Sequence, residues 1–190
     1  MNQTHFLESA LETSREAGDI LMQHFGNIDL IERKSSITDL LTKADTESEA
    51  FILKKINSLY PKHHIIAEES NNDQNRCDYR WVIDPLDGTT NFVHNLPIFA
   101  VSIGLQYKME TILGVVYNPA VDKCFWAEKS GGAFLNGESI YITSTNTLSE
   151  SLLVTGFQYI HNDEWARSFE LFKEFYGKTQ GIRRLGAAAL

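Results

Sequence analysis

Residues 100–141 constrain the fold more than any other part of the sequence, because four apolar segments follow one another there at short intervals. These segments are rich in β-branched and aromatic residues, as β-strands usually are. Asn136-Gly137, after the fourth segment, is a strong signal for a two-residue hairpin turn. The sequence therefore predicts an antiparallel meander with strands over residues 101–105, 111–117, 123–127 and 132–135. We expect the aromatic side chains of Phe125, Trp126 and Phe134 to lie in its core.

Two amphipathic helices are predicted before these strands. Residues 5–25 carry apolar side chains at helical spacing, and Gly26 is a suitable stop. A second helix is expected to begin at Asp45 or Thr46 and to end before Pro61, with Glu49 placed as a capping box requires. Its buried stripe is expected to consist of Ala50, Leu53, Ile56 and Leu59.

Two short apolar segments are predicted to be strands that end in acidic residues. Residues 65–67 lead to Glu68, and residues 81–83 lead to Asp84. Carboxylates at the ends of adjacent strands can share an ion that neither would bind alone. The alternative for Glu68, from its local sequence alone, is an ordinary surface loop.

The polar, turn-prone residues 143–149 predict a boundary between two domains, over residues 1–145 and 146–190. The second domain is expected to begin with a strand over residues 152–156 and a helix over residues 164–175. Residues 182–186 would then return toward the first domain.

Composition excludes several classes of protein. The formal net charge of −8 argues against a general nucleic-acid-binding surface, which needs clustered Lys and Arg. No apolar run approaches the roughly 20 residues of a membrane span, and the N-terminus lacks the pattern of a signal peptide. We therefore expect a cytoplasmic protein without a membrane partner. Cys77 and Cys124 are expected to be free thiols.

Residues 84–91 form the part of the sequence with the clearest chemistry. Asp84, the carbonyl of Leu86 and Asp87 would offer three hard oxygen ligands of the kind that Mg²⁺ prefers. Gly88 lets backbone N–H groups approach an anion, and a helix starting at Thr89 would direct unpaired N–H groups toward a phosphate. The alternative is a type I turn after the strand, with no chemical role.

The segment Trp-Val-Ile-Asp-Pro-Leu-Asp-Gly-Thr-Thr-Asn-Phe over residues 81–92 resembles the first signature of the inositol monophosphatase family of Mg²⁺-dependent, lithium-sensitive phosphatases. Residues 34–45, 67–70, 97–104 and 183–189 extend the resemblance along nearly the whole chain. It implies a mixed α/β fold, the layered αβαβα sandwich of the inositol monophosphatase and fructose-1,6-bisphosphatase type, with an incomplete second domain. The family's second signature, Trp-Asp-x-x-Ala-Gly, would lie beyond Leu190, so we expect the native chain to be longer and the 190 residues alone to be nearly inactive.

The resemblance also implies roles for individual residues. Glu68, Asp84 and the Leu86 carbonyl would hold one Mg²⁺, and Asp84 and Asp87 a second, with two or three ions in the complete site. Asp45 and Thr89 would orient the attacking water.

For the substrate, the resemblance implies that Leu86, Asp87, Gly88 and Thr89 contact the phosphate side. Arg183, Gly186 and Ala187 would meet the polyol, although Arg183 is also compatible with a surface or subunit contact. The implied reaction is hydrolysis of myo-inositol 1-phosphate by a homodimer.

Three alternatives stay open at this stage. A haloacid-dehalogenase-like phosphatase would place one residue between its two aspartates, whereas two residues separate Asp84 and Asp87. A relative of the same fold would act on fructose bisphosphate, histidinol phosphate, a nucleotide 3′-phosphate or NADP. A non-catalytic, regulatory homologue would keep the fold without the reaction.

Overall fold

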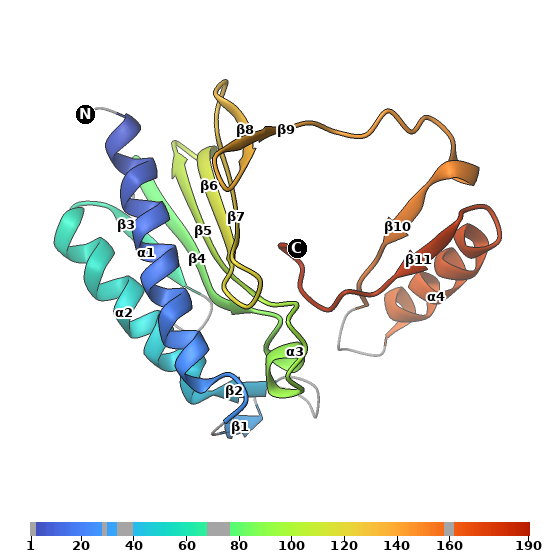
Figure 1. The fold of residues 1–190 in the computed structure, drawn as a ribbon, viewed down its shortest axis with the longest axis horizontal. Helices are drawn as coiled ribbons and strands as arrows, with labels where there is room; N and C mark the ends of the chain where they lie inside the picture. Colours follow the sequence, from blue (N-terminus) through green and yellow to red (C-terminus); the bar gives the residue numbers. More distant parts are fainter. Residues whose placement is uncertain (1–2, 28–29, 34–39, 68–76, 158–161) are drawn as a thin grey trace.

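A seven-stranded sheet forms the centre of the fold in the computed structural model, which describes residues 3–27, 30–33, 40–67, 77–157 and 162–190 (Figure 1). The strand order is β3-β4-β5-β6-β7-β8-β9. β3 and β4 are parallel, and every later pair is antiparallel. The strands are β3 (His64–Ala67), β4 (Tyr79–Asp87), β5 (Ala100–Tyr107), β6 (Glu110–Asn118), β7 (Lys123–Glu128), β8 (Gly132–Leu135) and β9 (Glu138–Ile140).

The predicted meander is confirmed as β5 to β8, and the predicted hairpin turn leads into one further strand, β9. Asn136 and Gly137 both have positive φ, at 49° and 90°, as the predicted two-residue hairpin turn requires. Phe125, Trp126 and Phe134 are half-buried rather than core residues, and the rings of Trp126 and Phe134 stack at 4.0 Å. The difference arises because the helices pack on β4, β5 and β6 and leave β7 and β8 partly open.

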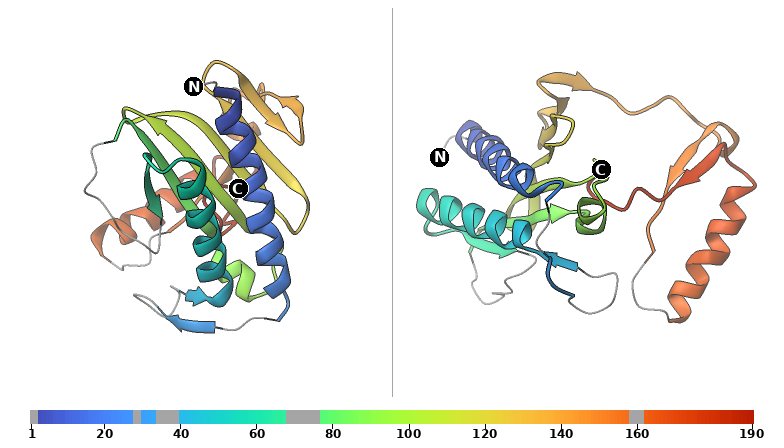
Figure 2. Two further views of the ribbon diagram at one scale, coloured as in Figure 1. Left: turned by 90° about the vertical axis from the view of Figure 1, so that its left-hand side faces the viewer. Right: turned by 60° about the horizontal axis from the view of Figure 1, so that its bottom comes forward.

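The helices α1 (Gln3–His24) and α2 (Lys43–Leu59) pack against each other on one face of this sheet (Figures 1 and 2). Gly26 has a φ of 87° just after α1, so the predicted stop is confirmed. The buried side of α1 consists of Phe6, Leu7, Ala10, Ala17 and Leu21, together with Ser9, Thr13 and Ser14.

The beginning of α2 differs from the prediction. Its N-cap is Thr42, and Asp45 is the third residue of a capping box, so neither Asp45 nor Thr46 is the cap. The predicted stripe is confirmed at Ile56 and in part at Leu53, which is half-buried against the core, but Ala50 and Leu59 are exposed. The buried side consists of Ala44, Asp45, Ser48, Glu49, Ile52 and Ile56. Polar residues occupy this side because they face the end of β4, where Ser48 Oγ donates to the Pro85 carbonyl at 3.2 Å.

Two small elements lie beside the large sheet. The strands β1 (Leu30–Arg33) and β2 (Leu40–Thr42) pair antiparallel and lead into α2. The short helix α3 (Thr89–Val93) follows β4 directly, with Gly88 as its N-cap. Both elements therefore border the end of β4, where the acidic residues lie.

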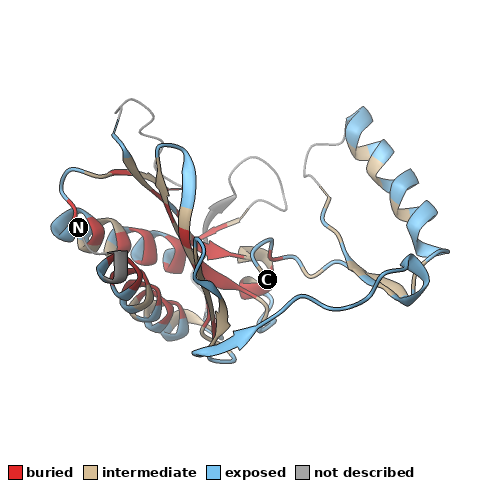
Figure 3. Ribbon diagram, turned by 90° about the horizontal axis from the view of Figure 1, so that it is seen from above, coloured by how far each residue is buried: buried red, intermediate tan, exposed pale blue. Residues whose placement is uncertain are grey.

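The C-terminal part is a separate small layer joined by the exposed residues 141–147 (Figure 1). It contains the 3₁₀ turn η1 (Leu148–Glu150), the strand β10 (Leu152–Val154), the helix α4 (Asp163–Tyr176) and the strand β11 (Gly181–Arg183). β10 and β11 form a parallel pair, and both strands and α4 are largely exposed (Figure 3). The mixed α/β fold is thus confirmed, while the domain division near residue 145 stays a prediction. Within the described ranges, no helix has the length and apolar character needed to cross a membrane.

Candidate active site

A β-bulge at the end of β4 brings Asp84 and Asp87 to the same side of the sheet. Asp84 pairs with Ser102 and Asp87 with Ala100, so three steps along β4 match two steps along β5. Residues three apart in a regular strand point to opposite faces, and the extra residue removes that difference. The alternative of a type I turn after residue 83 is therefore wrong, because β4 continues through Asp87 with a bulge at Pro85-Leu86.

The bulge is stabilised by a local hydrogen bond of Asp84. The N–H of Leu86 donates to Asp84 Oδ1 at 3.1 Å, which is the contact of an Asx turn. The Leu86 side chain is buried, so the residue anchors the loop and its carbonyl stays near the acids. That carbonyl accepts a hydrogen bond from Thr89 Oγ at 3.1 Å.

Asp45 and Thr89 meet although 44 residues separate them in the sequence. Thr89 Oγ lies 3.1 Å from Asp45 Oδ1, and Asp45 is only 2% exposed. The other carboxylate oxygen accepts hydrogen bonds from the N–H of Thr42 at 2.8 Å and from Thr42 Oγ at 2.5 Å. Asp45 thus belongs to the capping box of α2 and also contacts Thr89 Oγ, while its role in orienting the water stays a prediction.

Asp87 is held by the last residues of the chain, which the sequence did not predict. The N–H groups of Ala188 and Ala189 donate to Asp87 Oδ1 and Oδ2 at 2.9 and 2.6 Å. Asp87 is buried, with an exposed fraction of 9%. Adjacent Ala residues at a chain end carry no sequence signal for such a contact, because the donors are backbone groups.

The predicted substrate residues fall into two groups. Ala187 is buried against Gly88, where a Cβ built on Gly88 would lie 3.1 Å from the Ala187 Cβ, so these residues and Gly186 belong to the same region. Arg183 is exposed on β11, and its Nη1 donates to the carbonyl of its neighbour Ile182 at 3.2 Å. The structure therefore does not join Arg183 to the acids, and its role stays a prediction.

The donor set fits a hard metal ion only in part. Two carboxylates and a backbone carbonyl near the bulge are oxygen donors of the type that suits Mg²⁺. Glu68, the third predicted acid, lies outside the described residues, and those that are described contain no group of three His, Cys, Asp or Glu side chains able to hold a metal. The strand before it is nevertheless placed as predicted, because Ala67 pairs with Ile83 in parallel register.

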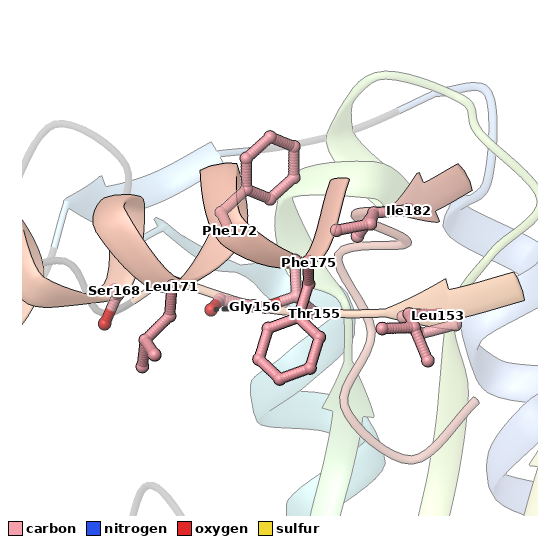
Figure 4. A pocket seen from close by; sticks show the side chains of 9 residues that line it. Leu153, Thr155, Gly156, Ser168, Leu171, Phe172, Phe175 and Ile182 are labelled. Atoms are coloured by element: carbon pink, nitrogen blue, oxygen red, sulfur yellow. Dashed lines mark hydrogen bonds between the residues drawn. The ribbon is translucent and has the colours of Figure 1, made fainter. Parts of the chain in front are cut away.

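A separate pocket of about 290 Å³ lies between α4 and the small sheet (Figure 4). Its lining is mainly apolar, with Leu153, Phe172, Phe175 and Ile182 among the residues around it. No acidic or basic side chain lines it. The residues that line this pocket therefore offer no carboxylate or basic group for acid–base or metal chemistry.

Comparison with known proteins shows which family and which solved structures this chain resembles. The profile of the inositol monophosphatase family matches residues 2–190. The chain is 42% identical to "Inositol-1-monophosphatase" of Synechocystis over 97% of its own length and 65% of that relative. It is 38% identical to "Phosphatase IMPL1, chloroplastic" of Arabidopsis thaliana, over 100% of this chain and 53% of the relative.

Two further similarities broaden the comparison. "Fructose-1,6-bisphosphatase/inositol-1-monophosphatase" of Thermotoga maritima is 37% identical, over 97% of this chain and 69% of its own. The crystal structure of "extragenic suppressor protein suhB" from Bartonella henselae superimposes with a TM-score of 0.90 at 31% identity, over 97% of this chain and 72% of that one. The chain thus spans about half to three quarters of the length of these relatives.

Proposed function

Because the chain belongs to the inositol monophosphatase family, we propose that the protein hydrolyses phosphate monoesters of small polyols with the help of Mg²⁺. The observation that carries the proposal is the hydrogen bond between Thr89 Oγ and Asp45 Oδ1, close to the bulge that carries Asp84 and Asp87. Such a hydroxyl–carboxylate pair can take a proton from water, and the two acids can hold the cation that a phosphate needs.

We assign the proton transfer to Thr89 and Asp45. The attacking water would give a proton to Thr89 Oγ while Thr89 passes its own proton to Asp45 Oδ1, 3.1 Å away. Thr42 fixes the orientation of the carboxylate, because both of its donors bind the opposite oxygen. The pair would thus be oriented before substrate arrives.

We assign the metal ligands to Glu68, Asp84, the Leu86 carbonyl and Asp87. Bound Mg²⁺ would neutralise charge on the phosphoryl group and lower the pKa of a coordinated water. The N–H of Leu86 orients the Asp84 carboxylate through Oδ1. Glu68 acts with Asp45 and Thr89 in activating the water in this proposal.

The phosphate would be bound by backbone N–H groups at Gly88 and Thr89. Gly88 has a φ of 92°, and a side chain there would meet the Ile98 carbonyl at 3.0 Å, so glycine keeps this turn open. The segment that carries Gly186 and Ala187, with Arg183 before it, would meet the polyol.

Within this class, myo-inositol 1-phosphate is our first choice of substrate, with a lithium-sensitive, homodimeric enzyme in the cytoplasm. The test is phosphate release with Mg²⁺ from inositol 1-phosphate, fructose 1,6-bisphosphate, histidinol phosphate, a 3′-phosphonucleotide and NADP. We expect the highest kcat/KM for inositol 1-phosphate. A preference of about tenfold or more for another substrate would replace this choice, since tenfold is about 1.4 kcal/mol of transition-state binding.

The second candidate is a regulatory protein with the same fold. It is favoured by the similarity to a structure named as an extragenic suppressor protein. Absence of phosphate release by the full-length protein from the whole panel at saturating Mg²⁺ would support this candidate and contradict the first.

A further inference from the structure

The buried side chain of Asn91 connects three segments around the acidic cluster. It lies in α3, two residues after Thr89, and is only 8% exposed. Its Nδ2 donates to the carbonyl of Ile98 and to the carbonyl of Leu185, both at 2.7 Å. The second bond reaches across 94 positions of the sequence.

We propose that Asn91 is a positioning residue that fixes residues 185–189 against Asp87 and so orients this carboxylate. Its expected effect on KM and on the Mg²⁺ requirement rests on the proposed function. The contact itself is a structural claim that can be tested without substrate.

Close packing shows how tightly Asn91 and the C-terminal segment fit together. Gly186 has a φ of 80°, and a Cβ on it would lie 3.0 Å from both Oδ1 and Nδ2 of Asn91. The next residue, Ala187, is 7% exposed and packs beside Gly88. The backbone of residues 185–187 is thus held on two sides by α3 and the turn before it.

This placement determines the contacts of Asp87. The two residues after Ala187 donate their N–H groups to separate oxygens of the Asp87 carboxylate, at 2.9 and 2.6 Å. A carboxylate that accepts one backbone donor on each oxygen is restricted in rotation, and its remaining lone pairs keep a fixed direction. Asn91 therefore acts on Asp87 through the backbone and does not touch the reacting groups in this proposal.

An asparagine suits this position for a chemical reason. Its amide has two N–H donors on a short side chain, and both are used on carbonyl groups of different segments. Asp has nearly the same shape but no donor when ionised, so it would place negative charge against two carbonyl oxygens.

Asn118 provides a matched control. It is 5% exposed, and its Nδ2 donates to the Pro97 carbonyl at 3.1 Å, one residue before Ile98. Its Oδ1 accepts from the N–H of Ala120. Its hydrogen bonds therefore stabilise the same loop without reaching residues 185–189.

The first test is amide hydrogen exchange of the protein without substrate or metal, followed by mass spectrometry of a peptide covering residues 184–190. Loss of two hydrogen bonds in Asn91→Ala should accelerate exchange of Ala188 and Ala189 about tenfold or more. Asn91→Ser, which keeps one hydroxyl donor, should give an intermediate increase and serves if the Ala variant does not fold. Asn118→Ala should leave this peptide within about twofold of the wild type. Equal exchange in wild type and both Asn91 variants would overturn the inference.

The second test separates positioning from a general loss of structure. In Asn91→Ser, we expect KM and the half-saturating Mg²⁺ concentration to rise several-fold while kcat changes less. In Asn118→Ala, both quantities should stay close to the wild type. A fall in kcat alone, or the same change in both variants, would contradict the proposed role. If the full-length wild-type protein released no phosphate at all, the proposed function would fail, while faster exchange in the Asn91 variants would still support the positioning contact.

Discussion

Replacing Thr89 and Asp45 singly and together tests whether they act as one proton-transfer unit. Thr89→Val removes the hydroxyl and keeps the branched shape, and Asp45→Asn removes the carboxylate charge. Positioned general acid–base groups contribute about 10²- to 10⁴-fold to rate. Since Thr89 Oγ lies 3.1 Å from Asp45 Oδ1 and both are needed for the transfer, we expect each variant to lower kcat by about 10³-fold, or about 4 kcal/mol.

The double variant should lower kcat little further than either single one. When two groups act in the same step, removal of either one abolishes their joint contribution to kcat. The losses of free energy from the two substitutions therefore do not add. The assay is phosphate release at saturating Mg²⁺ and substrate. Multiplied losses, near 10⁶-fold in the double variant, would show that the two residues act independently and would refute the relay.

Stability measurements separate this effect from damage to the fold. Thr89→Val removes one hydrogen bond to a buried carboxylate, which should cost about 1–3 kcal/mol. Asp45→Asn should destabilise more, because it also disturbs the hydrogen bonds to Thr42 that cap α2. Urea unfolding of each variant gives these values, and Thr89→Ser, which retains the hydroxyl, should keep kcat within about tenfold of the wild type.

Three further predictions concern pH, backbone conformation and metal. Burial lowers the pKa of His63 below its ordinary value, and its Nδ1 accepts a hydrogen bond from Trp81 Nε1 at 3.1 Å. The unfolded chain therefore binds the proton more strongly than the folded protein, so the free energy of unfolding should fall as the pH drops through about 6.5. Unfolding measured at pH 7.5 and 5.5 should show a smaller loss in His63→Phe than in the wild type. Equal losses in the two proteins would contradict this. Gly186→Ala should lower the unfolding free energy by about 1–3 kcal/mol and raise KM, since its φ is 80° and the added Cβ would crowd Asn91. Chelation should abolish phosphate release and added Mg²⁺ should restore it in the wild type but not in Asp84→Asn, so activity that survives chelation would exclude the metal mechanism.

The sequence predicted the meander well because its information is local. Each strand from β5 to β9 is bounded by its own turn, and the φ values of Asn136 and Gly137 follow from residue type. α1 was predicted for the same reason, with an apolar stripe that ends at Gly26. Neither element depends on a contact that is distant in the sequence.

α2 was predicted as a helix, but its buried side was not. Apolar spacing favours Ala50 and Leu59, which the structure leaves exposed. The structure instead buries Asp45, Ser48 and Glu49 with the apolar residues. Apolar spacing does not predict the burial of these polar residues, because burial of a polar group is unfavourable without partners. Thr42 is a local partner of Asp45 in the capping box, whereas the carbonyl of Pro85 becomes adjacent to Ser48 only when α2 packs at the end of β4.

The candidate site shows the same division between chemistry and geometry. Residue types alone indicated Asp84, Leu86 and Asp87 as ligands, and the family resemblance paired Asp45 with Thr89, whose contact the structure contains. The bulge that turns both acids to one side depends on the register of β4 against β5, which a single strand does not specify. The positions of the N–H groups that bind Asp87 depend on the φ of 80° at Gly186 and on the hydrogen bond from the Asn91 amide to residue 185. The alanines that carry these N–H groups show no sequence pattern that would reveal either feature. Residues that supply chemistry are thus visible in the sequence, whereas residues that aim them are visible only once the segments they join have been brought together.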